Sequence, residues 1–292
     1  KKLPTSIQKK ALMKLLILWK KVIEELFSIA SMKRIAIFGS TGSVGTQSLS
    51  VINQNKNQFD IISLSCNHNA DLLFEQTKKF MPKKIGINTI PEHHPITEFC
   101  KKNSIDLIVG ENSSDILSQY KEIDLVINAI VGTDGLIPTI NTVNNNIELA
   151  LSNKESLVLG GHLIMPKVKE NTANLIPVDS EHSAIFQCLH GEESDVLKKI
   201  ILTGSGGPFL KRELNTFSSI CQEEALKHPN WDMGKKISID SATMMNKGLE
   251  LVEAMWLFNV NKKDIEIVIH PESIIHSMVQ FIDDSYKAHL GI

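Results

Sequence analysis

The sequence has 292 residues, of which 42% are hydrophobic and 22% are charged. A chain of this length and composition has room for roughly two domains with a sizeable core, which excludes a disordered, collagen-like or disulfide-stapled miniature protein. The net charge of −2 excludes an overall basic field that would recruit nucleic acid or an anionic membrane. The four cysteines form no C-x-x-C pair, so we expect reduced core residues rather than a zinc or redox site.

The first 31 residues differ from the rest of the sequence. This stretch is lysine-rich and amphipathic, and its longest uninterrupted apolar run, residues 15–19, is too short to span a bilayer. It contains two glutamates and no arginine, which argues against an organelle transit sequence. We therefore expect residues 1–31 to be an extension, helical or disordered, without a catalytic role or a membrane span.

From Arg34 to Pro177, short apolar segments alternate with helical segments. This alternation predicts an α/β domain over residues 32–177, a Rossmann-like, doubly wound parallel sheet with helices on both faces. The predicted strands are residues 35–38, 61–64, 84–87, 107–109 and 125–127, and the predicted helices are residues 45–53, 70–80 and 135–143.

Beyond Pro177 the pattern changes to strands with one long helix. We predict an α+β catalytic domain over residues 178–292. Its predicted strands are residues 200–203, 237–239, 265–269 and 275–281, and its predicted helix is residues 242–258. The sequence ends without a helix cap or a polar tail, so we expect this domain to be incomplete at its C-terminal end.

A glycine-rich segment, residues 39–45 (GSTGSVG), joins the first predicted strand to the first predicted helix. Glycines at such a turn let backbone N–H groups approach a pyrophosphate, which then lies at the positive end of the helix dipole. The placement indicates a dinucleotide site, and a plain strand-to-helix turn is the alternative.

The end of the second predicted strand, residues 65–69 (SCNHN), contains no acidic residue. Enzymes that use NAD usually place Asp or Glu there to hold the ribose 2′-hydroxyl. Asn and His can instead accept a 2′-phosphate, so the segment favours NADP over NAD. Ordinary turn chemistry is the alternative explanation of these residues.

Residues 153–155 (NKE) follow the apolar stretch 147–151. Polar residues at strand ends of an open α/β sheet face the ligand crevice, so this tripeptide is well placed for catalysis. It is equally a helix start, because Asn caps helices and Glu favours the first turn.

Asp179 and Glu181 lie two residues apart, so in an extended segment both carboxylates point to the same side. Two facing carboxylates repel each other unless a cation lies between them, and oxygen ligands suit Mg²⁺ or Mn²⁺. Glu250, on the predicted long helix, is the candidate third ligand. The alternative is a helix cap with an acidic first turn. For His182 we expect a packed or surface residue rather than a ligand.

A second glycine turn, residues 203–208 (TGSGGP), follows another predicted strand. Its exposed amides and the Ser205 hydroxyl form an anion nest suited to phosphate. Ser241, Asn246 and Lys247, near the start of the predicted long helix, would complete a site for a phosphate monoester. The alternative is a sharp turn without a ligand.

Residues 227–235 form a loop with Pro, Gly and a single aromatic, Trp231. An exposed tryptophan in such a loop is typical of a lid that excludes water from a reacting site. The alternative is a buried anchor, which is how we interpret Trp256 on the long helix.

Six segments, taken together and in order, resemble one family, the 1-deoxy-D-xylulose 5-phosphate reductoisomerases of the non-mevalonate isoprenoid pathway. They are GSTGSVG, NKESLV, VDSEHSAIFQ, GSGGPF, HPNWDMG and DSATMMNKGLE. The resemblance implies NADPH- and divalent-metal-dependent conversion of 1-deoxy-D-xylulose 5-phosphate to 2-C-methyl-D-erythritol 4-phosphate. It also implies a homodimer, in a bacterial cytoplasm or a plastid. Family members continue into a helical C-terminal domain, which we expect to be absent here.

The resemblance implies a role for each matching residue. For NADPH these are Thr41, Gly42, Ser43, Val44, Asn67, His68, Asn69, Asn153, Glu155 and Gly234, with Asn67 standing where the family often has glycine. For the substrate they are Lys154, Ser180, Glu181, Ser205, His228, Trp231, Ser241, Asn246, Lys247 and Glu250. The metal ligands are Asp179, Glu181 and Glu250, which with Lys154 form the catalytic set. Two alternatives stay open: a cofactor-binding fragment without turnover, and a semialdehyde or homoserine-type NADP dehydrogenase.

Overall fold

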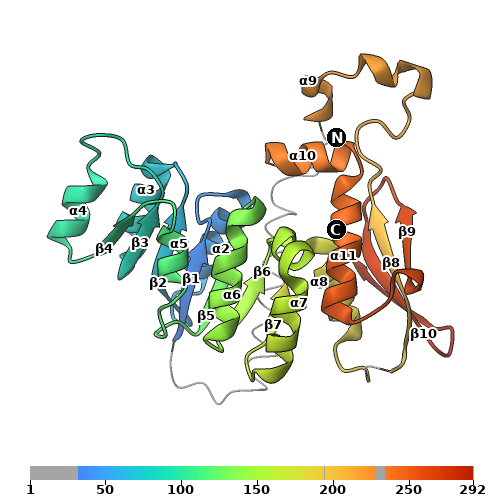
Figure 1. Cartoon of the computed structure of the whole chain (residues 1–292), viewed down its shortest axis with the longest axis horizontal. Helices are drawn as coiled ribbons and strands as arrows, with labels where there is room; N and C mark the ends of the chain where they lie inside the picture. Colours follow the sequence, from blue (N-terminus) through green and yellow to red (C-terminus); the bar gives the residue numbers. More distant parts are fainter. Residues whose placement is uncertain (1–31, 194, 228–233, 292) are drawn as a thin grey trace. The chain divides into compact units, whose positions relative to one another are not determined.

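The computed structural model describes residues 32–193, 195–227 and 234–291. They form two compact units, which divide between Ile176 and Pro177 and are described separately (Figure 1). None of the helices in these ranges combines the length and the apolar character that crossing a membrane requires.

The first unit is built on a parallel sheet. Within residues 32–177 its strand order is β4-β3-β2-β1-β5-β6-β7, and the neighbouring strands from β4 to β6 pair in parallel. The chain moves from β1 towards one edge and from β5 towards the other, so right-handed crossovers place the connecting helices on opposite faces. This confirms the Rossmann-like, doubly wound fold. The strands are β1 (Lys33–Phe38), β2 (Phe59–Cys66), β3 (Lys84–Ile87), β4 (Asp106–Val109), β5 (Leu125–Asn128), β6 (Glu148–Leu151) and β7 (Leu175–Pro177).

Helices cover this sheet because its central strands are apolar on both faces. All four residues of the run 35–38 in β1 are completely buried. Helices α5, α6 and α7 lie side by side along one face (Figure 1). The helices are α2 (Ser43–Gln54), α3 (Ala70–Phe80), α4 (Ile96–Lys102), α5 (Ser113–Leu117), η1 (Gly132–Gly135), α6 (Leu136–Asn144) and α7 (Lys154–Glu170).

The second unit is a mixed sheet with helices packed on it, which confirms the predicted α+β class. Within residues 177–291 the strand order is β11-β10-β8-β9, where β10 is antiparallel to β8 and β11, and β8 is parallel to β9. Helices α8 and α11 bury Ile185 and Ala254 against residues of β8 and β10. The elements are α8 (Ser180–Leu189), β8 (Leu197–Gly204), η2 (Leu214–Ser219), α9 (Gln222–Ala225), α10 (Lys235–Ala242), α11 (Met245–Phe258), η3 (Lys262–Asp264), β9 (Ile265–Ile269), β10 (Ile275–Phe281) and β11 (Tyr286–Leu290).

Two local predictions in this unit are wrong. The predicted strand at residues 237–239 lies inside α10, where Lys236 pairs with Asp240 one helical turn away at 2.7 Å. The segment Ile-Ser-Ile is too short to distinguish a strand from a helix, and this local pairing favours the helix. The predicted helix 242–258 is interrupted, because Met244 takes a left-handed conformation with φ of 60° and α11 begins only at Met245.

Candidate active site

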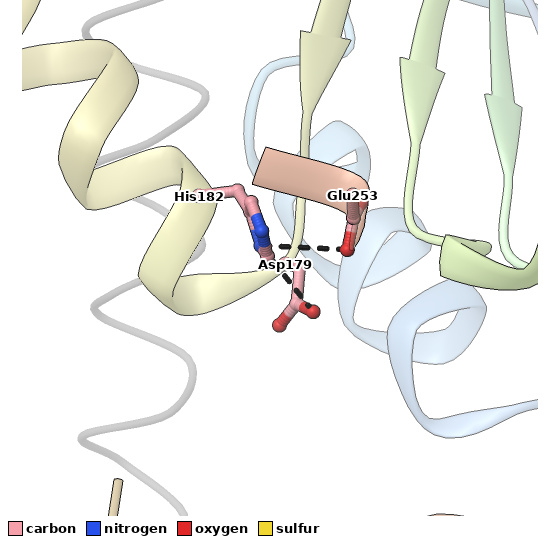
Figure 2. A group of neighbouring side chains, drawn as sticks. All are labelled: Asp179, His182 and Glu253. Carbon is pink, nitrogen blue, oxygen red and sulfur yellow. Dashed lines mark ion pairs between the residues drawn. The ribbon is translucent and has the colours of Figure 1, made fainter. Parts of the chain in front are cut away.

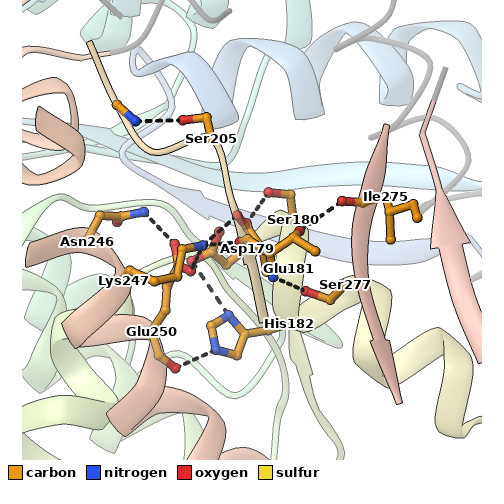
Figure 3. A network of polar contacts seen from close by, with 12 residues as sticks. Asp179, Ser180, Glu181, His182, Ser205, Asn246, Lys247, Glu250, Ile275 and Ser277 are labelled. Carbon is orange, nitrogen blue, oxygen red and sulfur yellow. Dashed lines mark hydrogen bonds and ion pairs between the residues drawn. The ribbon is translucent and has the colours of Figure 1, made fainter. Parts of the chain in front are cut away.

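Three carboxylates from two helices converge in the second unit (Figure 3). Asp179 is the N-cap residue of α8, Glu181 lies in its first turn, and Glu250 is completely buried on α11. Each offers an oxygen that lies within 4.8 Å of the other two. The extended conformation expected for the segment from Asp179 to Glu181 is wrong, since α8 begins at Ser180 with Asp179 at its N-cap position. The carboxylates nevertheless meet, because the cap residue and the first turn both lie at the end of the helix that faces Glu250.

Lys247 lies between two of these carboxylates. Its buried ammonium donates hydrogen bonds to Glu181 Oε1 at 2.8 Å, to Glu250 Oε2, and to the Thr203 carbonyl oxygen at 2.6 Å. Burial acts to lower the pKa of Lys247, but the two carboxylates outweigh it and the pKa lies above its ordinary value. The lysine is therefore a fixed positive charge inside the acidic cluster.

Glu181 is held in its ionised form by the same contact. Burial and the neighbouring Asp179 charge act to raise the pKa of Glu181. The charge of Lys247, with hydrogen bonds from Lys247 and from Ser180 Oγ at 2.5 Å, holds that pKa below its ordinary value. The cluster thus presents a charged carboxylate rather than a neutral acid at neutral pH.

His182 connects the two helices that carry the carboxylates (Figure 2). It is completely buried, its Nε2 donates to the Glu250 carbonyl oxygen at 2.9 Å, and its Nδ1 lies 3.4 Å from Glu253 Oε2 and 3.7 Å from Asp179 Oδ2. Burial acts to lower the pKa of His182, but the surrounding carboxylates, Glu253 foremost, raise it to about 9. The packed state expected for this histidine is what the structure contains.

Glu253 is a residue of this cluster that the sequence did not single out. It is completely buried on α11, and with Asp179 and His182 it forms a second group whose ligand atoms lie within 4.8 Å of one another. Lys247, Glu250 and Glu253 are spaced three residues apart, which places them on one face of a helix. This spacing could have predicted Glu253 as a neighbour of Glu250.

The second glycine turn packs against the end of α10 and against Lys247. A Cβ atom at Gly207 would lie 2.7 Å from the Ser241 carbonyl oxygen, and one at Gly204 would lie 2.9 Å from Lys247 Cε. Gly206 and Gly207 have φ of 83° and 72°, the left-handed region that favours glycine. The structure therefore brings the turn, Ser241 and Lys247 together, as the phosphate hypothesis requires.

The remaining residues predicted for this unit fall into three groups. Ser205 Oγ accepts from the Gly207 amide at 3.3 Å, and Asn246 donates to Glu250 Oε1, so both belong to the network of Figure 3. Gly234 is the exposed N-cap residue of α10. His228 and Trp231 lie outside the described residues.

In the first unit, the loop of residues 39–45 has the geometry of a nucleotide-binding turn. Gly39 has φ of 79°, and a Cβ atom at Gly45 would overlap the backbone of residues 39 and 40, so neither position admits a side chain. Gly42 and Ser43 are exposed at the start of α2, with Thr41 and Val44 half-buried beside them. The first turn of α2 has no acidic residue, so its positive end is open to an anion.

The exposed residues after β2 contact the loop after β3. His68 Nδ1 lies 2.9 Å from Thr89 Oγ1, and Asn88 donates to Asn67 Oδ1 at 2.8 Å, whereas Asn69 caps α3 by accepting from the Leu72 amide. The sequence analysis did not predict Asn88 and Thr89 at this place. They directly follow the predicted strand 84–87, and the carboxyl ends of the parallel neighbours β2 and β3 lie at one edge of the sheet, so their position could have been predicted.

Asn153 caps helix α7 and also binds the loop that follows β5. Its Oδ1 accepts from the Ser156 amide at 2.8 Å, and its Nδ2 donates to the carbonyl oxygens of Ile130 and Gly132 at 2.8 and 2.7 Å. The helix-start interpretation is therefore correct, and Lys154 and Glu155 form the first turn of α7 with Lys154 buried.

The carboxylate set fits a divalent cation of the hard class. All of its ligand atoms are carboxylate oxygens, which Mg²⁺ and Mn²⁺ prefer. The four buried or half-buried carboxylates Asp179, Glu181, Glu250 and Glu253 face two cationic groups, Lys247 and His182. A divalent cation between the oxygens of Asp179, Glu181 and Glu250 would offset the mutual repulsion of these carboxylates.

Comparison with known proteins identifies the family of this chain. The family model of 1-deoxy-D-xylulose 5-phosphate reductoisomerase matches residues 35–161, and the model of that enzyme's C-terminal domain matches residues 175–258. Over 263 residues the chain is 46% identical to the 1-deoxy-D-xylulose 5-phosphate reductoisomerase of Clostridium perfringens strain 13, covering 89% of this chain and 68% of that relative. The chain belongs to the 1-deoxy-D-xylulose 5-phosphate reductoisomerase family.

Other reductoisomerases are similar over the same part of the chain. The enzyme of Chloroherpeton thalassium is 49% identical and the match covers 67% of it. Two solved structures are each 37% identical, with TM-scores of 0.82. One is DOX-P reductoisomerase with NADPH, fosmidomycin and magnesium, and the other is the Zymomonas mobilis enzyme with NADPH. They cover 89% and 90% of this chain. The chain spans about two thirds of each relative, from 66% to 68%.

Family membership confirms the resemblance found in the sequence. It gives the predicted class of enzyme, an NADP-dependent oxidoreductase, and favours the reductoisomerase over the semialdehyde and homoserine-type alternatives.

Proposed function

We propose that this chain converts 1-deoxy-D-xylulose 5-phosphate to 2-C-methyl-D-erythritol 4-phosphate with NADPH and Mg²⁺ or Mn²⁺. The observation that carries the proposal is the convergence of Asp179, Glu181 and Glu250 within 4.8 Å, beside a glycine turn and a buried lysine. The names of the relatives, and the magnesium and NADPH in the neighbouring crystal structures, support it.

Asp179, Glu181 and Glu250 would hold the divalent ion. The ion would act as a Lewis acid that lowers the cost of negative charge on the carbonyl and hydroxyl oxygens of the substrate. Lys247 keeps Glu181 and Glu250 ionised and limits their mutual repulsion, so the chain maintains charged ligands in a buried place.

The glycine turn of β8 would bind the substrate's phosphate. Its backbone amides, with Ser205, Ser241, Asn246 and Lys247, offer donors and positive charge that suit a phosphate dianion. Binding energy from this remote group would orient the carbon skeleton for the rearrangement. Ser180, hydrogen-bonded to Glu181, is proposed as a further substrate contact.

The domain of residues 32–177 would bind NADPH, which supplies the hydride for the reduction. The amides at the start of α2, with Thr41, Gly42, Ser43 and Val44, would hold the pyrophosphate. The exposed residues after β2, which lack an acid, would hold the 2′-phosphate; they are Asn67, His68 and Asn69. The nicotinamide half is assigned to Asn153, Glu155 and Gly234, as the family resemblance implies.

The other parts of the proposal rest on the family alone. Residues 178–292 form the catalytic domain, Lys154 adds positive charge near the reacting oxygens, His228 binds substrate and Trp231 closes as a lid. The enzyme is a homodimer with no nucleic-acid partner. The relatives are bacterial proteins, which supports the cytoplasm over a plastid as its location.

The test is NADPH oxidation with 1-deoxy-D-xylulose 5-phosphate, with and without Mn²⁺. We expect turnover that depends on the metal and that Glu250→Gln abolishes, while the affinity for NADPH stays within about twofold of wild type. Turnover without a divalent ion, or an active Glu250→Gln enzyme, would contradict the metal role. NADPH binding without any turnover would favour a cofactor-binding fragment instead.

A further inference from the structure

A buried polar network lies in the first unit behind the loop of residues 129–135, called here the β5 loop. It consists of Asn128 at the end of β5, Thr139 on α6 and Ser156 on α7, and all three are completely buried. Asn128 Nδ2 donates to Thr139 Oγ1 at 2.9 Å, and Thr139 Oγ1 donates to Ser156 Oγ at 3.2 Å. The Ser156 hydroxyl in turn donates to Asn153 Oδ1. A buried network whose members are hydrogen-bonded fixes one arrangement of the elements that it joins.

Two asparagines hold the β5 loop from different elements. Asn128 Oδ1 accepts from the Ile130 amide at 3.2 Å, and Asn128 Nδ2 donates to the Gly135 carbonyl oxygen at 2.9 Å. Asn153 Nδ2 donates to the carbonyl oxygens of Ile130 and Gly132 at 2.8 and 2.7 Å. The conformation of this loop is therefore set by side chains of β5 and of the residue before α7.

All four hydrogen-bonding positions of the Asn153 carboxamide are used within the protein. Its oxygen accepts from the amide and the hydroxyl of Ser156, and its nitrogen donates to two carbonyl oxygens of the β5 loop. An amide oxygen accepts two hydrogen bonds and an amide nitrogen donates two. Asn153 therefore serves a ligand site by placing the β5 loop and the first turn of α7, rather than by donating to the ligand.

The β5 loop lies where an open α/β sheet binds its ligand. β1 and β5 are neighbouring strands from which the chain proceeds to opposite edges of the sheet, and ligands of such folds bind outside their carboxyl ends. A Cβ atom at Gly39, in the glycine-rich segment after β1, would lie 2.6 Å from the Ala129 carbonyl oxygen, so the two loops are in contact. With the adenosine end of NADPH assigned after β2 and the pyrophosphate after β1, the nicotinamide half extends over β5, the next strand in the order.

We propose that Asn128, Thr139 and Ser156 are positioning residues for the nicotinamide half of NADPH. They hold Asn153, the β5 loop and the first turn of α7 in the binding conformation before the cofactor is bound. A loop that is fixed in advance loses little further freedom on binding, so preorganisation raises the affinity for this half of the cofactor. The proposal rests on the proposed binding of NADPH by residues 32–177.

Calorimetric titration of the whole chain with two ligands tests the proposal. NADPH contains both halves, whereas adenosine 2′,5′-bisphosphate contains the adenosine half with its 2′-phosphate and lacks the nicotinamide half. Thr139→Val replaces the hydroxyl of the network by a methyl group. We expect it to raise the Kd of NADPH by about 3–10-fold, the effect of ordering one side chain on binding, and to leave the Kd of adenosine 2′,5′-bisphosphate within about twofold of wild type.

Two further variants of α6 separate the network from the general stability of the unit. Thr139→Ser keeps the hydroxyl, so it should bind both ligands within about twofold of wild type. Thr142→Val is the matched control, because Thr142 is equally buried on α6 and its hydroxyl donates to the Pro138 carbonyl oxygen of the same helix at 2.7 Å. It should lower the midpoint of urea unfolding, since a buried hydrogen bond is lost, and leave both dissociation constants within about twofold of wild type.

The pattern of losses decides the outcome. A loss of NADPH affinity alone, in Thr139→Val but not in Thr139→Ser or Thr142→Val, supports the proposal. An unchanged Kd of NADPH in Thr139→Val, an equal loss of both ligands, or the same selective loss in Thr142→Val would overturn it. If Thr139→Val does not fold, Ser156→Ala removes the next member of the network and is judged by the same pattern.

Failure of the proposed function gives a different result. A wild type that binds neither ligand contradicts the NADPH role of residues 32–177, and the proposal is lost with it. A wild type that binds both ligands equally well keeps a nucleotide site but overturns the proposal, because the nicotinamide half would gain nothing from the protein. Where wild type binds NADPH more tightly, the NADPH role stands and the variants decide on the positioning residues alone.

Discussion

Replacing Lys247 by Met should strongly destabilise the second unit in the absence of metal. The substitution keeps the apolar stem and removes the ammonium, which leaves Glu181 and Glu250 facing each other without a counter-charge. Two hydrogen bonds to charged groups at about 1.5–3 kcal/mol each, and measured losses of about 3–5 kcal/mol for breaking buried pairs, give an expected loss near 4 kcal/mol. Lys199→Met, which breaks an exposed pair with Glu266, should cost about 0–1 kcal/mol.

The pH dependence of this loss follows from the pKa directions. Because the pKa of Glu181 is lower in the folded chain than in the unfolded one, its stabilising contribution is present above the unfolded value and is lost as the pH falls through the folded value. Wild type should therefore lose stability on acidification below about pH 5. In Lys247→Met the carboxylates gain from protonation, so the difference between variant and wild type should shrink over that range.

Urea unfolding in the presence of a chelator, followed by tryptophan fluorescence, to which Trp256 on α11 contributes, measures these differences. A loss of about 4 kcal/mol corresponds to a midpoint shift of about 2 M urea for a slope near 2 kcal/mol/M. Mn²⁺ should restore part of the stability, because a divalent ion supplies charge between the same carboxylates. Equal midpoints for Lys247→Met and Lys199→Met, or a gap that does not narrow on acidification, would refute the reasoning.

Three further predictions concern the first unit. Gly45→Ala should destabilise it by about 1–3 kcal/mol and weaken NADPH binding. At Gly42 a Cβ would lie 3.3 Å from its nearest neighbour, so Gly42→Ala should destabilise the unit less. Urea unfolding compares the two variants, and equal losses of stability would contradict the packing argument. Asn153→Ala should lower the free energy of unfolding by about 2–3 kcal/mol in the same assay, since a helix cap and two hydrogen bonds to carbonyl oxygens are lost together. A loss under about 0.5 kcal/mol would show that these hydrogen bonds do not stabilise the unit. NADH should bind at least about tenfold more weakly than NADPH, because no acid after β2 holds a ribose 2′-hydroxyl; equal dissociation constants, measured by nucleotide fluorescence, would contradict NADP selectivity.

The sequence predicts those elements whose ends carry their own chemical signals. Helix α3 agrees residue for residue, because Asn69 caps its start and two lysines occupy its last turn. Strands β3, β9 and β10 also agree, as bounded apolar runs. The strand predicted at residues 237–239 (ISI) is wrong because two apolar residues in a run of three do not distinguish a strand from a helix. The pair of Lys236 with Asp240 one helical turn away adds local support to the helix.

The candidate site also contains residues that the sequence predicts and one that it does not. Asp179, Glu181 and Glu250 were predicted from residue type and spacing, and the structure brings them together even though the local conformation of the first two was wrong. Glu253 was missed, because a glutamate in a helix is usually exposed and only the packing of α8 against α11 buries it beside His182.

The left-handed residue Met244 has a consequence for how the chain tolerates length changes. Each residue of an α-helix advances its side chains by about 100° around the axis, so the joint between α10 and α11 sets the rotational phase of Lys247 and Glu250. Adding or removing one residue at this joint would turn both side chains away from α8 while leaving the composition of the site intact. The number of residues between Ser241 and Lys247 is therefore as strict a requirement as their identities.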